Sequence, residues 1–142
     1  MPLRDFRAAP LNVLIVDDDV SFAEALRMFL GGDERMNVLG VAVNLREALT
    51  HARQGAYDLA LVDVRLIEGD GFGVVSALRD LDPKLVSVMM SGLDVDVYRD
   101  DAFNAGARAV RCRCKRMDRW LGRWSATIWG KPVRGRHPDS SD

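Results

Sequence analysis

Hydrophobic residues along this chain occur in two alternating patterns. Short continuous runs rich in Val, Ile and Leu predict strands that are buried on both faces, as in parallel sheets. Segments in which apolar residues recur every three or four positions predict helices between those strands. We expect strands at 11–16, at 36–43, in the run that ends at Asp63, at 85–90 and at 109–114. We expect helices at 20–30, 45–54, 72–81, 95–105 and 117–128.

Five strands that alternate with five helices through short connections predict one fold class. The sheet should be parallel, with right-handed crossovers and helices on both faces, which is a doubly wound α/β domain. Residue types at the helix ends agree with this division: Asp19 or Ser21 and then Asn44 suit N-caps, and Gly55 and Pro83 suit helix ends.

Length and composition are those of one ordinary globular domain. The chain has 142 residues, of which 48% are hydrophobic and 29% are charged. We expect a flexible arm at 1–10, a single domain at 11–129 and a disordered tail at 130–142. No apolar run is long enough to span a bilayer, no secretory signal opens the chain, and its two cysteines are too few for a zinc site. We therefore expect a cytoplasmic protein without membrane contact.

Charge is divided unevenly along the chain. Residues 1–107 hold 10 basic and 18 acidic side chains, a net charge of −8. Residues 108–142 hold 10 basic and 3 acidic side chains, a net charge of +7. This polarity could steer an acidic partner, although a solvated face and a soluble tail explain it more simply. No motif for nucleic-acid recognition accompanies the basic end, so we expect no nucleic-acid partner.

Polar side chains collect where four of the predicted strands end. Asp17 and Asp18 follow the first strand, Asp63 ends the third, Ser91 follows the fourth, and basic residues end the fifth. The carboxyl ends of parallel strands meet at one edge of a sheet, so these groups should converge. Three carboxylates would repel one another without a cation, and oxygen ligands suit Mg²⁺. A hydroxyl and a cation nearby suit phosphoryl oxygens, and an aspartate there can form an acyl phosphate. The pattern therefore predicts in-line phosphoryl transfer.

Four short motifs in this arrangement resemble those of the receiver domains of two-component response regulators. Val16–Asp19 resembles the acidic pair after the first strand, and Asp63–Gly71 resembles the phosphoacceptor loop. Ser91–Gly92 resembles the Ser/Thr switch position, and Ala105–Ala107 resembles the turn before the fifth strand. The resemblance covers residues 11–129 and implies the flavodoxin-like form of the α/β fold.

The resemblance also implies a role for each candidate residue. Asp63 would accept a phosphoryl group from a phosphohistidine on a sensor histidine kinase or a phosphotransfer protein. Asp18 and Asp63 would ligate Mg²⁺ directly, Asp17 would act through water, and Arg65 would offer its backbone carbonyl. Ser91 would reach the phosphoryl group and reposition its loop. We expect a stand-alone signalling receiver that catalyses only its own phosphorylation and dephosphorylation, and not a turnover enzyme.

Three positions depart from the pattern of that family. Ile67 stands where the family usually has proline, which should loosen the loop without removing a ligand. Arg113, followed by Cys114, stands where the family has Lys followed by Pro. Either Arg113 or Lys115 would then supply the cation, and we favour Arg113, although its fork-shaped guanidinium is not equivalent to an ammonium group. Val110 replaces an aromatic residue, which puts an aromatic switch in doubt.

The last predicted helix carries one apolar stripe and two tryptophans beside it. The stripe suits core packing and consists of Met117, Leu121, Trp124 and Ile128. Trp120 and Trp129 fall off that stripe, near several arginines. An exposed Trp flanked by Arg suits an interface, and the resemblance implies a homodimer or an output partner at the face of the fourth helix, fifth strand and fifth helix. Both indoles could equally cover the edge of the core.

Two alternatives to a phosphorylated receiver remain open at this stage. Asp17-x-Asp19 after a strand is similar to the nucleophile motif of haloacid-dehalogenase-like phosphatases, but the chain has no cap domain and Asp63 would have no role. The second alternative is a degenerate receiver, which keeps the fold and acts as an unphosphorylated binding module. The departures at 110 and 113 favour it.

Overall fold

Five parallel strands form the centre of the computed structural model, which describes residues 10–92 and 95–112. The strands are β1 (Leu11–Val16), β2 (Met36–Ala42), β3 (Leu59–Asp63), β4 (Val86–Ser91) and β5 (Ala109–Cys112). They lie in the order β2-β1-β3-β4-β5, and every neighbouring pair is parallel. Because β1 and β3 are neighbours, the loops that follow them lie side by side at the carboxyl edge of the sheet.

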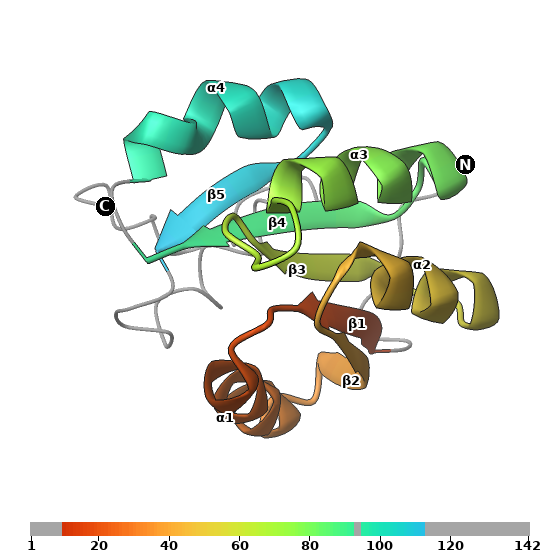
Figure 1. Ribbon diagram of the computed structural model, residues 1–142. Coiled ribbons are helices and arrows are strands. Elements are labelled where there is room, and N and C mark those ends of the chain that lie inside the picture. Colours follow the sequence, from red (N-terminus) through yellow and green to blue (C-terminus); the bar gives the residue numbers. More distant parts are fainter. Residues whose placement is uncertain (1–9, 93–94, 113–142) are drawn as a thin grey trace, which may run out of the picture.

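Four helices connect the strands within the described residues. They are α1 (Val20–Gly31), α2 (Leu45–Gln54), α3 (Gly71–Leu81) and α4 (Val95–Ala105). α1 lies on one face of the sheet, and α2, α3 and α4 cover the other (Figure 1). The predicted parallel α/β sheet is therefore confirmed. None of the described helices has both the length and the apolar character that a membrane crossing requires.

Several predictions fall on parts of the chain that the structure does not describe. The helix predicted at 117–128 and the last two residues of the predicted fifth strand lie outside the described residues. So do the predicted tail at 130–142 and all of the predicted arm except Pro10. These expectations therefore stay predictions.

The three central strands, β1, β3 and β4, are buried on both faces of the sheet, which explains their continuous apolar runs. Val13 and Ile15 pack on the side of α1, and Leu14 and Val16 pack on the side of α2 and α3. All four side chains are completely buried. Burying a side chain of this size contributes roughly 1.5–3 kcal/mol. Burial of these side chains therefore stabilises the strands at the centre of the sheet.

The strand-to-helix turns at the carboxyl edge are set by N-caps. Asp19, Asn44 and Asp70 begin α1, α2 and α3, and each side chain accepts a hydrogen bond from the N–H three residues later, at 2.9–3.1 Å. Asp19, and not Ser21, is thus the first cap. These caps aim the polar loops at the edge where the candidate site lies.

Within the described residues, three strand boundaries differ by one residue from the prediction. β4 ends one residue later than expected, at Ser91, which pairs with Cys112 of β5. β2 ends at Ala42 because the Val43 N–H donates to the Glu47 side chain, at 3.0 Å, in the capping of α2. β4 begins at Val86 because the Leu85 N–H donates to the Asp82 carbonyl, at 3.1 Å, in the preceding turn. At the end of β2 and the start of β4, the backbone N–H donates to a local turn and not to the neighbouring strand.

Candidate functional site

Three carboxylates meet at the carboxyl edge of the sheet. Asp17 and Asp18 directly follow β1, and Asp63 is the last residue of β3. One carboxylate oxygen of each lies within 4.8 Å of the others. Asp17 is fully buried and Asp63 is only 5% exposed. The parallel register that pairs Val16 with Val62 brings them together.

Backbone N–H groups orient each of these carboxylates. The Asp19 N–H donates to Asp17 Oδ1 at 2.8 Å, and the Arg65 N–H donates to Asp63 Oδ1 at 3.4 Å. The third donor comes from another loop, since the Ile67 N–H donates to Asp18 Oδ2. Hydrogen bonds of this kind restrict the rotation of a carboxylate.

The donor set fits a hard divalent cation. All three groups are carboxylates, their oxygens converge, and two of them are buried where like charges repel strongly. Oxygen ligands of this type suit Mg²⁺, which is usually held by a few carboxylates and keeps several waters. The sequence-based expectation of a carboxylate cluster is therefore confirmed, and its occupation by Mg²⁺ belongs to the proposal below.

The loop after β3 folds back tightly on the residue that precedes it. Gly71 donates its N–H to the Val64 carbonyl at 2.8 Å, and a Cβ atom at Gly71 would lie 2.1 Å from the Asp63 carbonyl oxygen. Gly69 has a φ of +93°, which favours glycine. Asp70, between them, caps α3, as expected of a turn residue. The two glycines thus serve different needs, one a conformation and the other a close approach.

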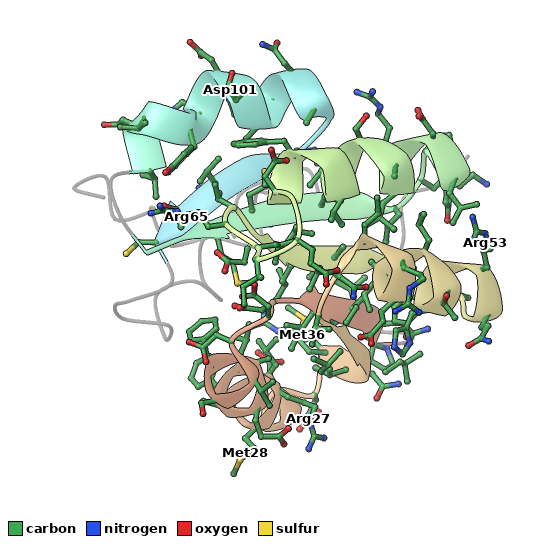
Figure 2. The ribbon with its side chains drawn as sticks, viewed as in Figure 1. Arg27, Met28, Met36, Arg53, Arg65 and Asp101 are labelled. Atoms are coloured by element: carbon green, nitrogen blue, oxygen red, sulfur yellow. The ribbon has the colours of Figure 1, made fainter. Side chains whose placement is uncertain are left out.

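The structure describes some of the remaining candidate residues and not others. Ser91 ends β4, is 3% exposed, and lies one position beyond Met90, which pairs with Asp63. Arg65 is exposed on the loop, and Figure 2 shows its side chain at the edge toward which the strands point. Arg113 and Lys115 lie outside the described residues.

Val110 occupies the position where the receiver family has an aromatic switch residue, and its side chain is part of the core. It is 6% exposed, pairs with Met89 of β4 and belongs to the apolar cluster beneath α2, α3 and α4. A buried valine has no large ring to move between the interior and solvent. Any response to modification of this site must therefore use other groups.

Sequence reasoning missed two contributions to the site. One is the backbone donor of Ile67, and the other is the approach of Gly71 to Asp63. A backbone N–H is common to every residue except proline, so no residue pattern indicates it. Gly71 itself can be read from the sequence. It stands at the start of a helix, where a positive φ is not needed, and this could have indicated that glycine is there to allow a close approach.

Comparison with known families identifies the family of this chain. Residues 13–112 match the family described as the response regulator receiver domain. This chain belongs to that family. Receiver domains are signalling modules of two-component systems, and the matched range contains all three carboxylates and Ser91. The match gives no support to a haloacid-dehalogenase-like phosphatase.

Curated relatives carry a similar receiver within longer chains. Transcriptional regulatory protein ZraR of Salmonella typhimurium is 33% identical over 97 residues, which are 68% of this chain and 22% of ZraR. The protein-glutamate methylesterase/protein-glutamine glutaminase of Nocardioides sp. is 36% identical over 99 residues, which are 68% of this chain and 27% of that protein. The receiver therefore spans about a quarter of the length of these relatives.

Solved structures show the same fold. A response regulator from Burkholderia pseudomallei, crystallised with a phosphorylated aspartic acid, a calcium ion and citrate, superposes with a TM-score of 0.70. It is 24% identical, and the alignment covers 83% of this chain and 66% of that one. This likeness establishes the architecture of the receiver.

Proposed function

We propose that this receiver accepts a phosphoryl group on Asp63 from a phosphohistidine, and that the modification changes how the domain binds a partner. The observation that carries the proposal is the convergence of three carboxylate oxygens within 4.8 Å at the end of β3. Of the three, only Asp63 is the last residue of a buried strand, and it pairs with Met90 of β4, the residue before Ser91. The donor would be a sensor histidine kinase or a phosphotransfer protein.

The transfer itself requires little from the protein beyond positioning. An oxygen of the Asp63 carboxylate attacks the phosphorus in line, the phosphorus–nitrogen bond breaks, and the imidazole leaves with that electron pair. An acyl phosphate results. Asp63 is only 5% exposed and ends β3, so the donor must reach it at the carboxyl edge of the sheet. The Arg65 N–H, which already donates to Asp63 Oδ1, keeps the carboxylate oriented during the attack.

Asp17, Asp18, Asp63 and the backbone carbonyl of Arg65 would hold Mg²⁺, whose bound charge offsets the negative charge of the phosphoryl oxygens. Ser91 would donate its hydroxyl to a phosphoryl oxygen from the end of β4. Arg113, or Lys115 in its place, would supply the cationic side chain. Each of these groups acts on charge and position, as phosphoryl transfer demands.

The proposed output face includes α4, which follows the loop after Ser91. Val97 and Phe103 on α4 are exposed by 67% and 49%, so this helix presents apolar surface. Movement of the loop after β4 would shift this helix relative to β5. We propose that a homodimer or an output partner binds at the α4–β5 face and the segment that follows it.

The test is phosphorylation by a small-molecule phosphodonor, with and without Mg²⁺, followed by intact mass measurement. We expect one phosphoryl group on the wild-type protein, dependent on Mg²⁺, and none on Asp63→Asn. Asp58→Asn, at the opposite end of β3, is a matched control and should be modified like the wild type.

Other outcomes would overturn the proposal in identifiable ways. A folded wild-type protein that gains no adduct and binds no Mg²⁺ would be a degenerate receiver. An adduct that persists in Asp63→Asn would place the phosphoacceptor elsewhere. Hydrolysis of a generic phosphomonoester that is lost in Asp17→Asn and kept in Asp63→Asn would favour phosphatase chemistry.

A further inference from the structure

The β3–α3 loop is connected to the β1–α1 loop by one backbone hydrogen bond. The Ile67 N–H donates to Asp18 Oδ2, between residues 49 positions apart in the sequence. Asp18 is half-buried and belongs to the carboxylate cluster. The Ile67 side chain is 88% exposed, so its contribution to this contact comes from the backbone and not from side-chain packing.

The rest of the loop is arranged so that this N–H points back into the site. Arg65 and Asp70 form an antiparallel bridge across the base of the loop, and Gly71 donates to the Val64 carbonyl at 2.8 Å. On the far side, the amide of Asn44 donates to Glu68 Oε1 at 3.4 Å. The tip of the loop is therefore held between the N-cap of α2 and the end of β1.

This arrangement leaves the Asp18 carboxylate oriented and still able to bind a cation. A carboxylate has two oxygens and about four acceptor positions, and the Ile67 N–H uses one of them. The bond restricts rotation of a half-exposed side chain that would otherwise lose that freedom only on binding metal. Partners that orient metal ligands commonly change metal affinity when they are removed.

We propose that Ile67 is a positioning residue of the metal site: its backbone N–H holds Asp18 for cation binding and so couples occupation of the site to closure of the β3–α3 loop. The inference rests on the proposed function, because it takes Mg²⁺ as the ion. Coupling is reciprocal, so an ion that binds better to the closed loop must also close the loop further. Proline at this position could not take part, since it has no N–H.

The experiment removes the N–H in two ways and retains it in a third. Ile67→Pro deletes the donor, and an amide-to-ester replacement at Ile67, introduced as the α-hydroxy acid, deletes it while keeping the side chain. Ile67→Ala truncates the exposed side chain and keeps the N–H. Mg²⁺ affinity is measured for all four proteins by amide chemical-shift titration, and the exchange rate of the Ile67 amide is measured with and without Mg²⁺.

We expect Ile67→Pro and the ester to bind Mg²⁺ more weakly by roughly three- to tenfold, and Ile67→Ala to bind within twofold of the wild type. Saturating Mg²⁺ should slow exchange of the Ile67 amide in the wild type by a similar factor. The amide shifts of the same metal-ligating residues should change in every titration, because none of the variants alters a metal ligand.

Each other outcome overturns the inference. Equal affinities in all four proteins, or faster amide exchange with Mg²⁺, would mean that the bond does not support the ion. Weak binding by Ile67→Pro with normal binding by the ester would assign the effect to the fixed φ of proline. If the wild-type protein binds no Mg²⁺, the metal part of the proposed function fails as well, which separates the two failures.

Discussion

Among the residues that the structure describes, carboxylates lie at both edges of the sheet, and three of them converge at the carboxyl edge. At the amino edge, Asp58 precedes β3 and accepts a hydrogen bond from the Asn12 N–H at 2.8 Å. Asp33, in the turn before β2, accepts from the Arg35 guanidinium at 2.9 and 3.1 Å. At the carboxyl edge, Asp63 ends β3 within a cluster of three carboxylates.

The difference lies in how the partners are supplied. At the amino edge, Asp58 and Asp33 each have donors of their own: the Asn12 N–H donates to Asp58, and the backbone and guanidinium of Arg35 donate to Asp33. At the carboxyl edge each carboxylate also receives a backbone N–H, but three negative charges share one small volume. A backbone N–H orients a carboxylate without cancelling its charge, so the convergence of three carboxylates suits this edge to a cation and to phosphoryl chemistry.

The largest effect should come from filling the space where the β3–α3 loop touches Asp63. Gly71→Ala would place a Cβ atom 2.1 Å from a backbone oxygen, so the loop must shift. We expect destabilisation of about 3 kcal/mol or more, measured by urea unfolding. Gly73→Ala is the matched control: its Cβ would have open space, with Asp70 Oδ1 the nearest atom at 3.8 Å.

The control variant should move in the opposite direction. Gly73 lies in the first turn of α3, where alanine is favoured over glycine by about 0.5–1 kcal/mol. Equal stabilities of the two variants would show that the loop does not pack on Asp63 as described.

Addition of Mg²⁺ should distinguish the two edges next. At a concentration ten times its Kd, Mg²⁺ should stabilise the wild-type protein by about 1.4 kcal/mol, measured by thermal or urea unfolding. Asp17→Asn, which removes one charge from the cluster, should lose most of this gain. Asp58→Asn should lower the basal stability by about 1 kcal/mol and keep the gain, because its carboxylate serves only the amino edge. If both variants lost the stabilisation by Mg²⁺, the proposed difference between the two edges of the sheet would be contradicted.

The sequence predicts those features of the fold and the site that depend on side-chain type. Continuous apolar runs predicted the three central strands, because these are buried on both faces, and the side-chain types at the strand ends predicted the cluster of Asp17, Asp18 and Asp63. Residue types are what a sequence displays directly. The bond from Ile67 to Asp18 uses a backbone atom and depends on the path of a loop, which residue types do not specify.

The glycines of the loop show the same limit. Gly69 and Gly71 both lie in the segment that resembles the phosphoacceptor loop. Glycine suits position 69 because of its positive φ, whereas position 71 requires glycine because the Asp63 carbonyl is so near. A close approach between two segments is a property of their packing, so it could be recognised only after the fold was known.

The smallest effect concerns the pH dependence of stability at the amino edge. The hydrogen bonds from Arg35 lower the pKa of Asp33 below its ordinary value of 3.8. A carboxylate whose pKa is lower in the folded state stabilises the fold above its unfolded pKa, and that contribution is lost as the pH falls through the folded pKa. The stability difference between wild type and Asp33→Asn should therefore be constant above about pH 5, at about 0.5 kcal/mol, and shrink below pH 4.

Urea unfolding at a series of pH values would measure this difference, and a double-mutant cycle would assign it. In an Arg35→Gln background, the difference between Asp33 and its Asn variant should lose most of its pH dependence, because the guanidinium is the main cause of the lowered pKa. The backbone N–H of Arg35, which also donates to Asp33 Oδ1 at 2.8 Å, would keep the remainder. A pH dependence that is unchanged without the guanidinium would mean that the turn, and not the ion pair, satisfies this carboxylate. The amino edge would then resemble the carboxyl edge in relying on backbone donors, and the contrast between them would rest on the clustering of charge alone.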